Sequence, residues 1–250
     1  MSLLRTDDLS VSFGGVKALS GVDLRVEQGG ITGLIGPNGA GKTTFIDAVT
    51  GMVPSSGHVT LGDVDITSMP PAERARLGLV RTFQTLELFE DLTVEDNLAA
   101  AALHRPWWQF IVDALWPWGS RSIPPAVDDA LELLGITDDR DRLPSDLSHG
   151  QRRLVGVARA LAARPRVLLL DEPAAGLDSA ESTALGQRLR AIADTGVTVF
   201  LIDHDMGLVL DVCDTIHVLD FGSIIASGTA DQVRTDPAVV AAYLGRAAEA

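Results

Sequence analysis

Residues 31–49 read ITGLIGPNGAGKTTFIDAV, and this stretch decides the fold. It contains the pattern G-x-x-x-x-G-K-[ST], which runs from Gly36 to Thr43. A short apolar run typical of a buried strand, 31–35, precedes the pattern, and a helical stretch, 42–49, follows it. A strand, a glycine-rich loop and a helix in this order are the context in which the pattern binds phosphate. The sequence therefore predicts a loop that binds the phosphates of a nucleotide.

The composition of this loop suits phosphate chemistry. Its glycines let backbone N–H groups converge on phosphate oxygens, and the N-terminus of the next helix adds partial positive charge. We expect Lys42 to reach the β- and γ-phosphates and Thr43 to hold Mg²⁺. The nucleotide contacts expected in the loop are Gly36, Asn38, Gly39, Ala40, Gly41, Lys42, Thr43 and Thr44. The structural alternative is a turn in which the glycines serve only the backbone.

A pair of carboxylates, Asp171 and Glu172, follows the run 166–170, in which Arg166 precedes four apolar residues. Open α/β sheets bind ligands at the carboxyl ends of their strands. We expect Asp171 to belong to the Mg²⁺ shell, and Glu172 to orient, or take a proton from, the water that attacks the γ-phosphate. The alternative is a solvated acidic turn after a core strand.

Further apolar runs extend the core. Residues 167–170 and 197–202 are continuous and apolar, and the stretch between them, near 179–193, is typical of a helix. Such runs indicate parallel strands that are buried on both faces and joined by crossover helices. We therefore expect an α/β core.

The regions outside this core have other patterns. Alternation in 9–13, and more weakly in 23–26, predicts half-exposed antiparallel strands. Pro, Trp and helix formers dominate 90–160, which favours a helical insertion. Near the end, β-rich runs around 220–222 predict a hairpin, and a last helix is expected at 230–244.

The composition of the 250-residue chain excludes several classes of protein. Hydrophobic residues make up 46% and charged residues 22%, which is close to average globular usage and argues against disorder. The net charge of −14 argues against a nucleic-acid partner. The single cysteine, Cys213, cannot form an internal disulfide, and we expect its side chain to be buried as a small hydrophobic group. We expect neither a secretory signal nor a membrane-spanning helix.

Residues 147–151 read LSHGQ and precede a helical run. Ser148 and Gln151 have the spacing of a capping box, so the residues alone predict a well-started helix. Together with the phosphate loop and the Asp171-Glu172 pair, the stretch resembles the LSGGQ signature of ATP-binding cassettes, with His149 in place of the first glycine. Over nearly its whole length the chain is similar to the ATP-binding subunits of ABC transporters.

This resemblance implies an architecture. The expected fold is α/β, a P-loop NTPase (RecA-like) core with an antiparallel β-subdomain and an inserted α-helical subdomain. We expect one cassette over residues 1–250. Residues 1–89 and 161–250 then form the nucleotide-binding core with its β-layer, and residues 90–160 form the helical subdomain that carries the signature.

The resemblance also implies ATP, Mg²⁺ and roles for single residues. It assigns Gln84 to Mg²⁺ contact and permease sensing, His204 to the γ-phosphate, and Asp178 to the D-loop. It further implies a head-to-tail dimer in which Ser148 and Gly150 of one subunit close over the nucleotide of the other. The expected catalytic residues are Lys42, Gln84, Glu172 and His204; the metal ligands are Thr43, Gln84 and Asp171; and the nucleotide contacts outside the loop are Phe13, Ser148, Gly150, Gln151 and Asp178.

Longer stretches narrow the resemblance to a subfamily. RTFQ followed by LELFEDLTVEDNL, then PAAGLD, then VCDTIHVLDFGSIIASGTADQV with a terminal AYLG resemble ATPase subunits of importers for branched-chain amino acids, amides and urea. The implied partners are membrane permease subunits, a second ATPase subunit that is the same chain or a paralogue, and indirectly a solute-binding protein. The implied location is the cytoplasm, at the inner face of the membrane through the permease. The alternative is another ABC system, such as lipopolysaccharide export.

Some positions allow two interpretations. Phe13 matches the aromatic residue that stacks on adenine, but its alternation with apolar neighbours also suits the core. The Trp-rich segment 106–118 suits either a membrane interface or packing on the helical subdomain. Leu88 and Phe89, which follow Gln84, suit either permease docking or the subunit's own core.

Overall fold

The computed structural model describes residues 2–82, 88–102 and 123–247, and the chain divides into two compact units. Unit 1 comprises Met1–Gln84 and Pro165–Ala250, and unit 2 comprises Thr85–Arg164. The helical subdomain expected at 90–160 falls within unit 2, whose ends lie a few residues outside those bounds. In the part of the chain that the structure describes, no helix is long and apolar enough to cross a membrane.

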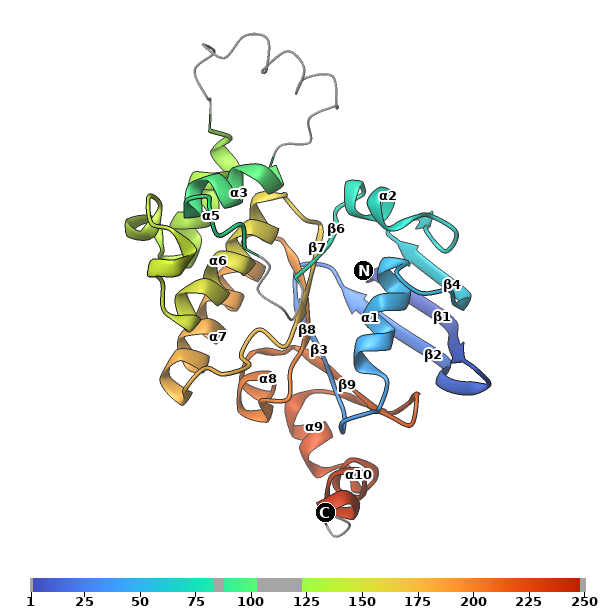
Figure 1. Ribbon diagram of the computed structural model, residues 1–250. Helices are drawn as coiled ribbons and strands as arrows, with labels where there is room; N and C mark the ends of the chain where they lie inside the picture. Colours follow the sequence, from blue (N-terminus) through green and yellow to red (C-terminus); the bar gives the residue numbers. More distant parts are fainter. Residues whose placement is uncertain (1, 83–87, 103–122, 248–250) are drawn as a thin grey trace. The chain divides into compact units, whose positions relative to one another are not determined.

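A six-stranded sheet forms the centre of unit 1, in the strand order β10-β9-β3-β8-β7-β6. Its strands are β3 (Ile31–Ile35), β6 (Leu79–Arg81), β7 (Val167–Asp171), β8 (Thr198–Ile202), β9 (Thr215–Asp220) and β10 (Ser223–Gly228). The strands β3, β6, β7, β8 and β9 are labelled in Figure 1. All pairings are parallel except that of β9 with β10, which forms the expected hairpin. Every residue of β3, β7 and β8 is buried. A central parallel strand is covered on both faces, which explains why these strands are continuous apolar runs in the sequence.

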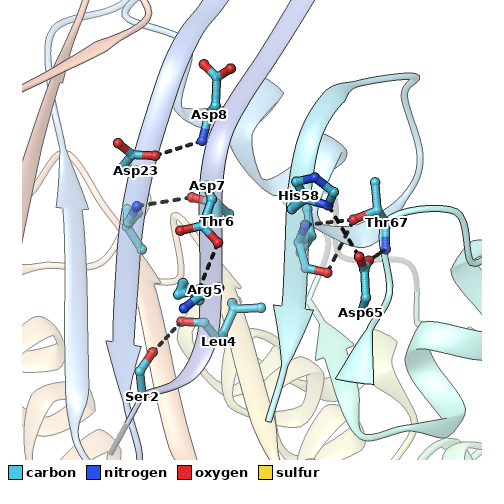
Figure 2. Close-up of polar contacts among 12 residues, drawn as sticks. Ser2, Leu4, Arg5, Thr6, Asp7, Asp8, Asp23, His58, Asp65 and Thr67 are labelled. Carbon is cyan, nitrogen blue, oxygen red and sulfur yellow. Dashed lines mark hydrogen bonds and ion pairs between the residues drawn. The ribbon is translucent and has the colours of Figure 1, made fainter. Parts of the chain in front are cut away.

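A second sheet of unit 1 is antiparallel and has the order β2-β1-β4-β5. Its strands are β1 (Ser2–Phe13), β2 (Val16–Glu27), β4 (Ser56–Leu61) and β5 (Val64–Asp65). Side chains complete the hydrogen bonding where the β1–β2 register shifts. The Leu24 N–H donates to Thr6 Oγ1 at 3.1 Å. The Asp8 N–H donates to Asp23 Oδ1 at 2.7 Å (Figure 2). These two backbone N–H groups are thereby paired despite the irregular register.

Helix α1 (Lys42–Thr50) packs into a core that both sheets share. Its Phe45 ring lies 5.6 Å from that of Phe200 in β8, measured between centroids, and Leu9 of β1 belongs to the same cluster. The other helices of unit 1 in the described residues are α2 (Pro71–Arg76), α7 (Ser179–Asp194), α8 (Met206–Val212), α9 (Ala230–Thr235) and α10 (Pro237–Ala247). The cysteine that follows α8, Cys213, is buried as expected, and burial raises the pKa of its thiol to about 12.

The prediction of one last helix at 230–244 is wrong. The chain forms two helices, α9 and α10, which meet at Asp236 and Pro237. Proline has no N–H for the helical ladder and disfavours helical dihedrals in the residue before it. Asp236 accordingly has the extended dihedrals φ −70° and ψ 123°.

Unit 2 is helical in its described residues. It contains α3 (Val94–Ala102), α5 (Pro125–Leu134), α6 (His149–Ala162) and two 3₁₀ turns, η1 (Thr137–Asp139) and η2 (Pro144–Asp146). The buried Asn97 ties the start of the unit to α3, since its Oδ1 accepts from the Phe89 N–H at 2.9 Å and its Nδ2 donates to the Leu92 carbonyl at 3.1 Å. The helical insertion predicted from the sequence is therefore present.

A buried arginine, Arg74 of α2, holds the C-terminal end of α1. It is 3% exposed. Its Nη1 donates to the carbonyls of Ala48 and Val49 in the last turn of α1, at 3.0 and 2.7 Å, and its Nε and Nη2 donate to Met69 and Thr67. Carbonyls in the last turn of a helix have no partner within the helix. The Ala48 carbonyl also accepts from the Gly51 N–H at 3.1 Å, and the Arg74 guanidinium supplies the donor for the Val49 carbonyl.

We expect Arg74→Ala to lower the free energy of unfolding by about 2–4 kcal/mol, because it leaves buried carbonyls without donors. Denaturant unfolding of the isolated subunit measures this loss. Arg76→Ala is the matched control, because Arg76 lies on the same helix and is exposed. Equal stability of the two variants would contradict the proposed role of Arg74.

Candidate functional site

The candidate site lies where three neighbouring parallel strands of unit 1 end. The order β3-β8-β7 places these strands side by side, and Ile202 of β8 pairs with Leu34 on one side and with Asp171 on the other. The phosphate loop follows β3, Asp171 ends β7, and His204 follows β8. The fold therefore brings three motifs that are far apart in the sequence to one edge of the sheet, where α/β proteins bind ligands.

The phosphate loop needs glycine at two positions because other backbone comes close. A Cβ on Gly36 would lie 2.0 Å from the Leu219 carbonyl oxygen, and a Cβ on Gly41 would lie 2.7 Å from that of Ala18. Gly41 also has φ 109°, which L side chains rarely adopt. The loop is thus shaped by contacts with β9 and β2, and not by its own sequence alone.

The loop leads into helix α1, whose first residue is the cationic Lys42. Lys42 is 8% exposed, and its Nζ donates to the carbonyls of Gly36 and Pro37 at 2.7 and 3.1 Å. Helix α1 has neither a side-chain N-cap bond nor an acidic residue in its first turn. Its first N–H groups and the Lys42 ammonium together suit an anion such as phosphate. Thr43, in the same turn, is exposed.

Asp171 is a buried carboxylate with a cationic partner. It is 2% exposed, and its Oδ2 accepts from Arg81 Nη2 at 2.9 Å. Burial raises the pKa of the Asp171 carboxyl, and the Arg81 guanidinium opposes this rise. Arg81 also forms a short hydrogen bond to Asp47 of α1. Neither Arg81 nor Asp47 is among the residues expected from the sequence, because no local pattern marks them.

Glu172 has a strained backbone and lies near His204. Its φ is 50°, which is unfavourable for a residue with a Cβ, and its N–H donates to the Ile202 carbonyl at 2.7 Å. Strain of this kind is concentrated at functional sites. The Glu172 Oε2 lies 4.0 Å from His204 Nδ1, and the His204 side chain is 60% exposed. The structure thus brings together Glu172 and His204, two of the four residues expected to be catalytic.

Asp203 is a further buried carboxylate of the site, and the sequence did not single it out. It is 1% exposed, and its oxygens accept from the N–H groups of Ala174 and Asp205, both at 2.9 Å. Its Oδ1 also lies 3.6 Å from His204 Nδ1. Asp203 therefore joins the segment after Glu172 to the segment that carries the histidine. Its place directly before His204, after a core strand, is the only signal that could have identified it.

The signature residues lie in unit 2 and start α6. The Gln151 N–H donates to Ser148 Oγ at 3.2 Å, and the Ser148 N–H donates to Gln151 Oε1 at 2.9 Å. This is the capping box that the spacing predicts. Gln151 Nε2 also donates to Asp139 at 3.1 Å, so its amide serves the fold of the unit. Ser148 and His149 are exposed, and Gly150 is half-buried.

Other expected site residues have more varied surroundings. Phe13 is 50% exposed, so it is not a core residue, and its stacking on adenine stays a prediction. Asp178 caps α7 by accepting from the Glu181 N–H at 2.8 Å. Ala40 is buried in the loop, and its carbonyl accepts from the Gly222 N–H at 2.9 Å. Asn38 and Gly39 are exposed and Thr44 is half-buried. Gln84 and the segment 106–118 lie outside the described residues.

The donor set fits Mg²⁺. Arg81 occupies Asp171 Oδ2, and Asp171 Oδ1 has no hydrogen-bond or ion-pair partner among the residues that the structure describes. Within those same residues, no group of three or more His, Cys, Asp or Glu could form an all-protein metal cage. Mg²⁺ is usually bound through one or two carboxylates, water and substrate phosphate, which matches one available carboxylate oxygen beside a phosphate loop.

Comparisons with known proteins agree with this geometry. Residues 19–175 match the family model for ABC transporters, and residues 223–249 match the model for branched-chain amino acid ATP-binding cassette transporters. The chain is 41% identical over 254 residues to a high-affinity branched-chain amino acid transport ATP-binding protein of Pseudomonas aeruginosa, with 98% of each chain covered. It is 38% identical to such a protein of Escherichia coli, and 37% identical to a lipopolysaccharide export system ATP-binding protein of Haemophilus influenzae, again with 98% of each chain covered.

Solved structures give the same result. A nucleotide-free ATP-binding cassette from an ABC transporter is similar with a TM-score of 0.85 and 33% identity, covering 97% of this chain and 99% of that one. The ADP conformation of an ATP-binding cassette has a TM-score of 0.84 and 33% identity, covering 98% and 99%. The expected α/β P-loop fold is confirmed. This chain therefore belongs to the ABC transporter family, as one of its ATP-binding, ATP-hydrolysing cassettes.

Proposed function

We propose that this cassette powers the import of branched-chain amino acids or related polar solutes. The observation that supports ATP hydrolysis is the alignment of the phosphate loop, Asp171, Glu172 and His204 at one sheet edge. The solute class rests on relatives that transport branched-chain amino acids and on the match of residues 223–249. Lipopolysaccharide export is the second candidate, because one relative with that role is 37% identical.

In this proposal the chain's own groups bind the nucleotide and move the proton. Lys42 and the N-terminus of α1 bind the β- and γ-phosphates, and Thr43 and Asp171 hold Mg²⁺, with Gln84 as a further ligand. The ion neutralises phosphate charge when it is bound. Water attacks the γ-phosphorus, the bond to the β-phosphate oxygen breaks, and the water's proton passes to Glu172. His204, at 4.0 Å from Glu172, orients the γ-phosphate.

The proposal includes a dimer and membrane partners. Ser148 and Gly150 of one subunit cover the nucleotide that Gly39, Lys42 and Thr43 of the other subunit hold. The second subunit is a copy of this chain or a paralogue. The pair drives a membrane permease that receives its solute from a binding protein, and the cassette lies in the cytoplasm at the inner face of that membrane.

The two residues predicted to contact the permease, Leu88 and Phe89, differ in exposure. Leu88 is 7% exposed and belongs to the core, so the docking prediction is wrong for this residue. Phe89 is 53% exposed, and its ring lies 5.9 Å from the Arg159 guanidinium. An exposed aromatic side chain on a backbone that Asn97 fixes suits a docking contact, so Phe89 remains the proposed permease residue.

Replacement of Glu172 tests the proposed chemistry. Glu172→Gln should keep ATP affinity but lower hydrolysis by about 100-fold or more, since an amide can hydrogen-bond the water and cannot take its proton. Phosphate release and equilibrium nucleotide binding are the two measurements. Glu132→Gln, at an exposed position of unit 2, is the control and should hydrolyse normally. Hydrolysis by Glu172→Gln within a factor of two of the unmodified chain would exclude Glu172 as the base.

Replacement of Ser148 tests the shared site. Ser148→Arg should leave ATP binding to the isolated subunit intact and abolish both ATP-dependent dimerisation and turnover, because the added bulk blocks closure. Asp129→Arg, at an exposed position of α5, is the control for the added arginine and should still dimerise. Gel filtration with ATP and Mg²⁺ measures the dimer. If both variants lose ATP binding, the defect is one of folding and the shared-site interpretation fails.

Purification of the chain with its membrane partners tests the solute class. The assembled complex should show ATP hydrolysis that rises several-fold with a solute-binding protein loaded with leucine, isoleucine or valine. Mass spectrometry of the bound solute is the second measurement. Stimulation by lipopolysaccharide, with no response to amino acids, would support the second candidate instead.

A further inference from the structure

Two charged side chains of unit 1, Asp47 and Arg81, have no part in the mechanism above, and they form a chain of ion pairs that ends at Asp171. Asp47 of α1 binds Arg81 at the end of β6, and Arg81 binds Asp171 at the end of β7. The side chains of Arg81 and Asp171 are 10% and 2% exposed, and that of Asp47 is 29% exposed. Exposed ion pairs contribute little to stability, whereas the loss of one partner from a buried pair is costly. The Arg81–Asp171 pair is of the buried kind.

The backbone fixes where Arg81 lies. In the parallel β6–β7 pair Arg81 is opposite Leu169, and the next residue, Thr82, donates its N–H to the Leu169 carbonyl at 2.9 Å. The Asp171 N–H in turn lies 3.4 Å from Thr82 Oγ1. The guanidinium therefore approaches the carboxylate from a strand whose register is set.

The contacts use separate nitrogens of Arg81. Nη1 donates to Asp47 Oδ1, and Nη2 donates to Asp171 Oδ2 at 2.9 Å. A planar guanidinium held at two points has a defined orientation, which a flexible ammonium does not have. The Asp171 carboxylate is thus held through one of its oxygens, and the other oxygen, Oδ1, has no partner among the described residues.

Asp47 connects this arrangement to the other proposed magnesium ligand in the described residues. Thr43 precedes Asp47 by four residues on α1, and positions i and i+4 lie on the same face of a helix. The pairs Asp47–Arg81 and Arg81–Asp171 therefore link the helix that carries Thr43 to the strand that carries Asp171.

We propose that Arg81 is a positioning residue for magnesium: it orients Asp171 so that Oδ1 is presented to the ion, and Asp47 holds Arg81 in place. This inference rests on the proposed function, since it takes Thr43 and Asp171 as the magnesium ligands. Partners of this outer kind typically change metal affinity by about 10- to 100-fold.

The test measures the Mg²⁺ requirement of nucleotide binding without turnover. In a Glu172→Gln background, binding of a fluorescent ATP analogue is titrated with Mg²⁺, and again in EDTA. Arg81→Gln should raise the Mg²⁺ concentration at half-saturation by about 10-fold or more and leave binding in EDTA unchanged. Arg81→Lys should restore part of the shift, because it keeps the charge and loses the fork. Asp47→Asn should give a smaller shift in the same direction.

Arg190→Gln is the control for loss of an ion pair, because Arg190 pairs with Asp214 at 2.8 Å elsewhere in unit 1. It should not move the Mg²⁺ midpoint. An unchanged midpoint in folded Arg81→Gln overturns the inference, and so does an equal loss of binding with Mg²⁺ and with EDTA, which indicates a purely structural role. If Arg81→Gln does not fold, the midpoints of Arg81→Lys and Asp47→Asn decide, and unchanged midpoints in both overturn the inference.

The variant Asp171→Asn separates this inference from the proposed function. An unchanged Mg²⁺ requirement in Asp171→Asn rejects the assignment of Asp171 as a magnesium ligand, on which the role of Arg81 depends.

Discussion

Close backbone contact around the phosphate loop is the constraint on which the rest of the site depends. The Leu219 carbonyl oxygen lies where the Cβ of a side chain at residue 36 would be, and the Ala18 carbonyl oxygen crowds the corresponding place at residue 41. Hydrogen bonds complete the support, since the Gly222 N–H donates to the Ala40 carbonyl and the Ser20 N–H donates to the Gly222 carbonyl. The antiparallel β-layer and the β9–β10 hairpin therefore hold the loop from outside, so that the N–H groups of α1 keep one direction.

The charged interior of unit 1 follows a common rule, because each buried charge has a defined partner. Lys42 donates to loop carbonyls, Arg74 to the end of α1, and Asp203 accepts from two backbone N–H groups. Asp171 instead has a cation on one oxygen. Removal of one partner from a buried ion pair lowers the stability of a protein by about 3–5 kcal/mol, because the other charge is left buried and unpaired. The same contacts that lower this cost also orient the groups that the proposed reaction uses.

The signature segment combines structure and proposed function in the same residues. Ser148 and Gln151 cap α6, and Asp178 caps α7 with Glu181. A capped helix start presents a fixed set of N–H groups, which suits contact with a phosphate held by another subunit. The local interpretation as a helix cap and the family interpretation as a nucleotide contact are therefore compatible, and the capping bonds are the ones seen in this chain.

The sequence alone predicted the features whose cause is local. The strand, loop and helix of residues 31–49, the buried strands β7 and β8, the β9–β10 hairpin and the capping box at Ser148 all follow from periodicity, turn chemistry or spacing within a few residues. The division of the last helix at Asp236 was missed although its cause, Pro237, is also local. The tertiary structure decided which strands are neighbours, which backbone presses on Gly36 and Gly41, and which side chains join Asp171. Asp47 and Arg81 are 34 residues apart, and Arg81 and Asp171 are 90 residues apart, so no short pattern records either pair. The parallel pairing of β6 with β7 brings Arg81 to Asp171, and the packing of α1 into the same core as β6 brings Asp47 to Arg81.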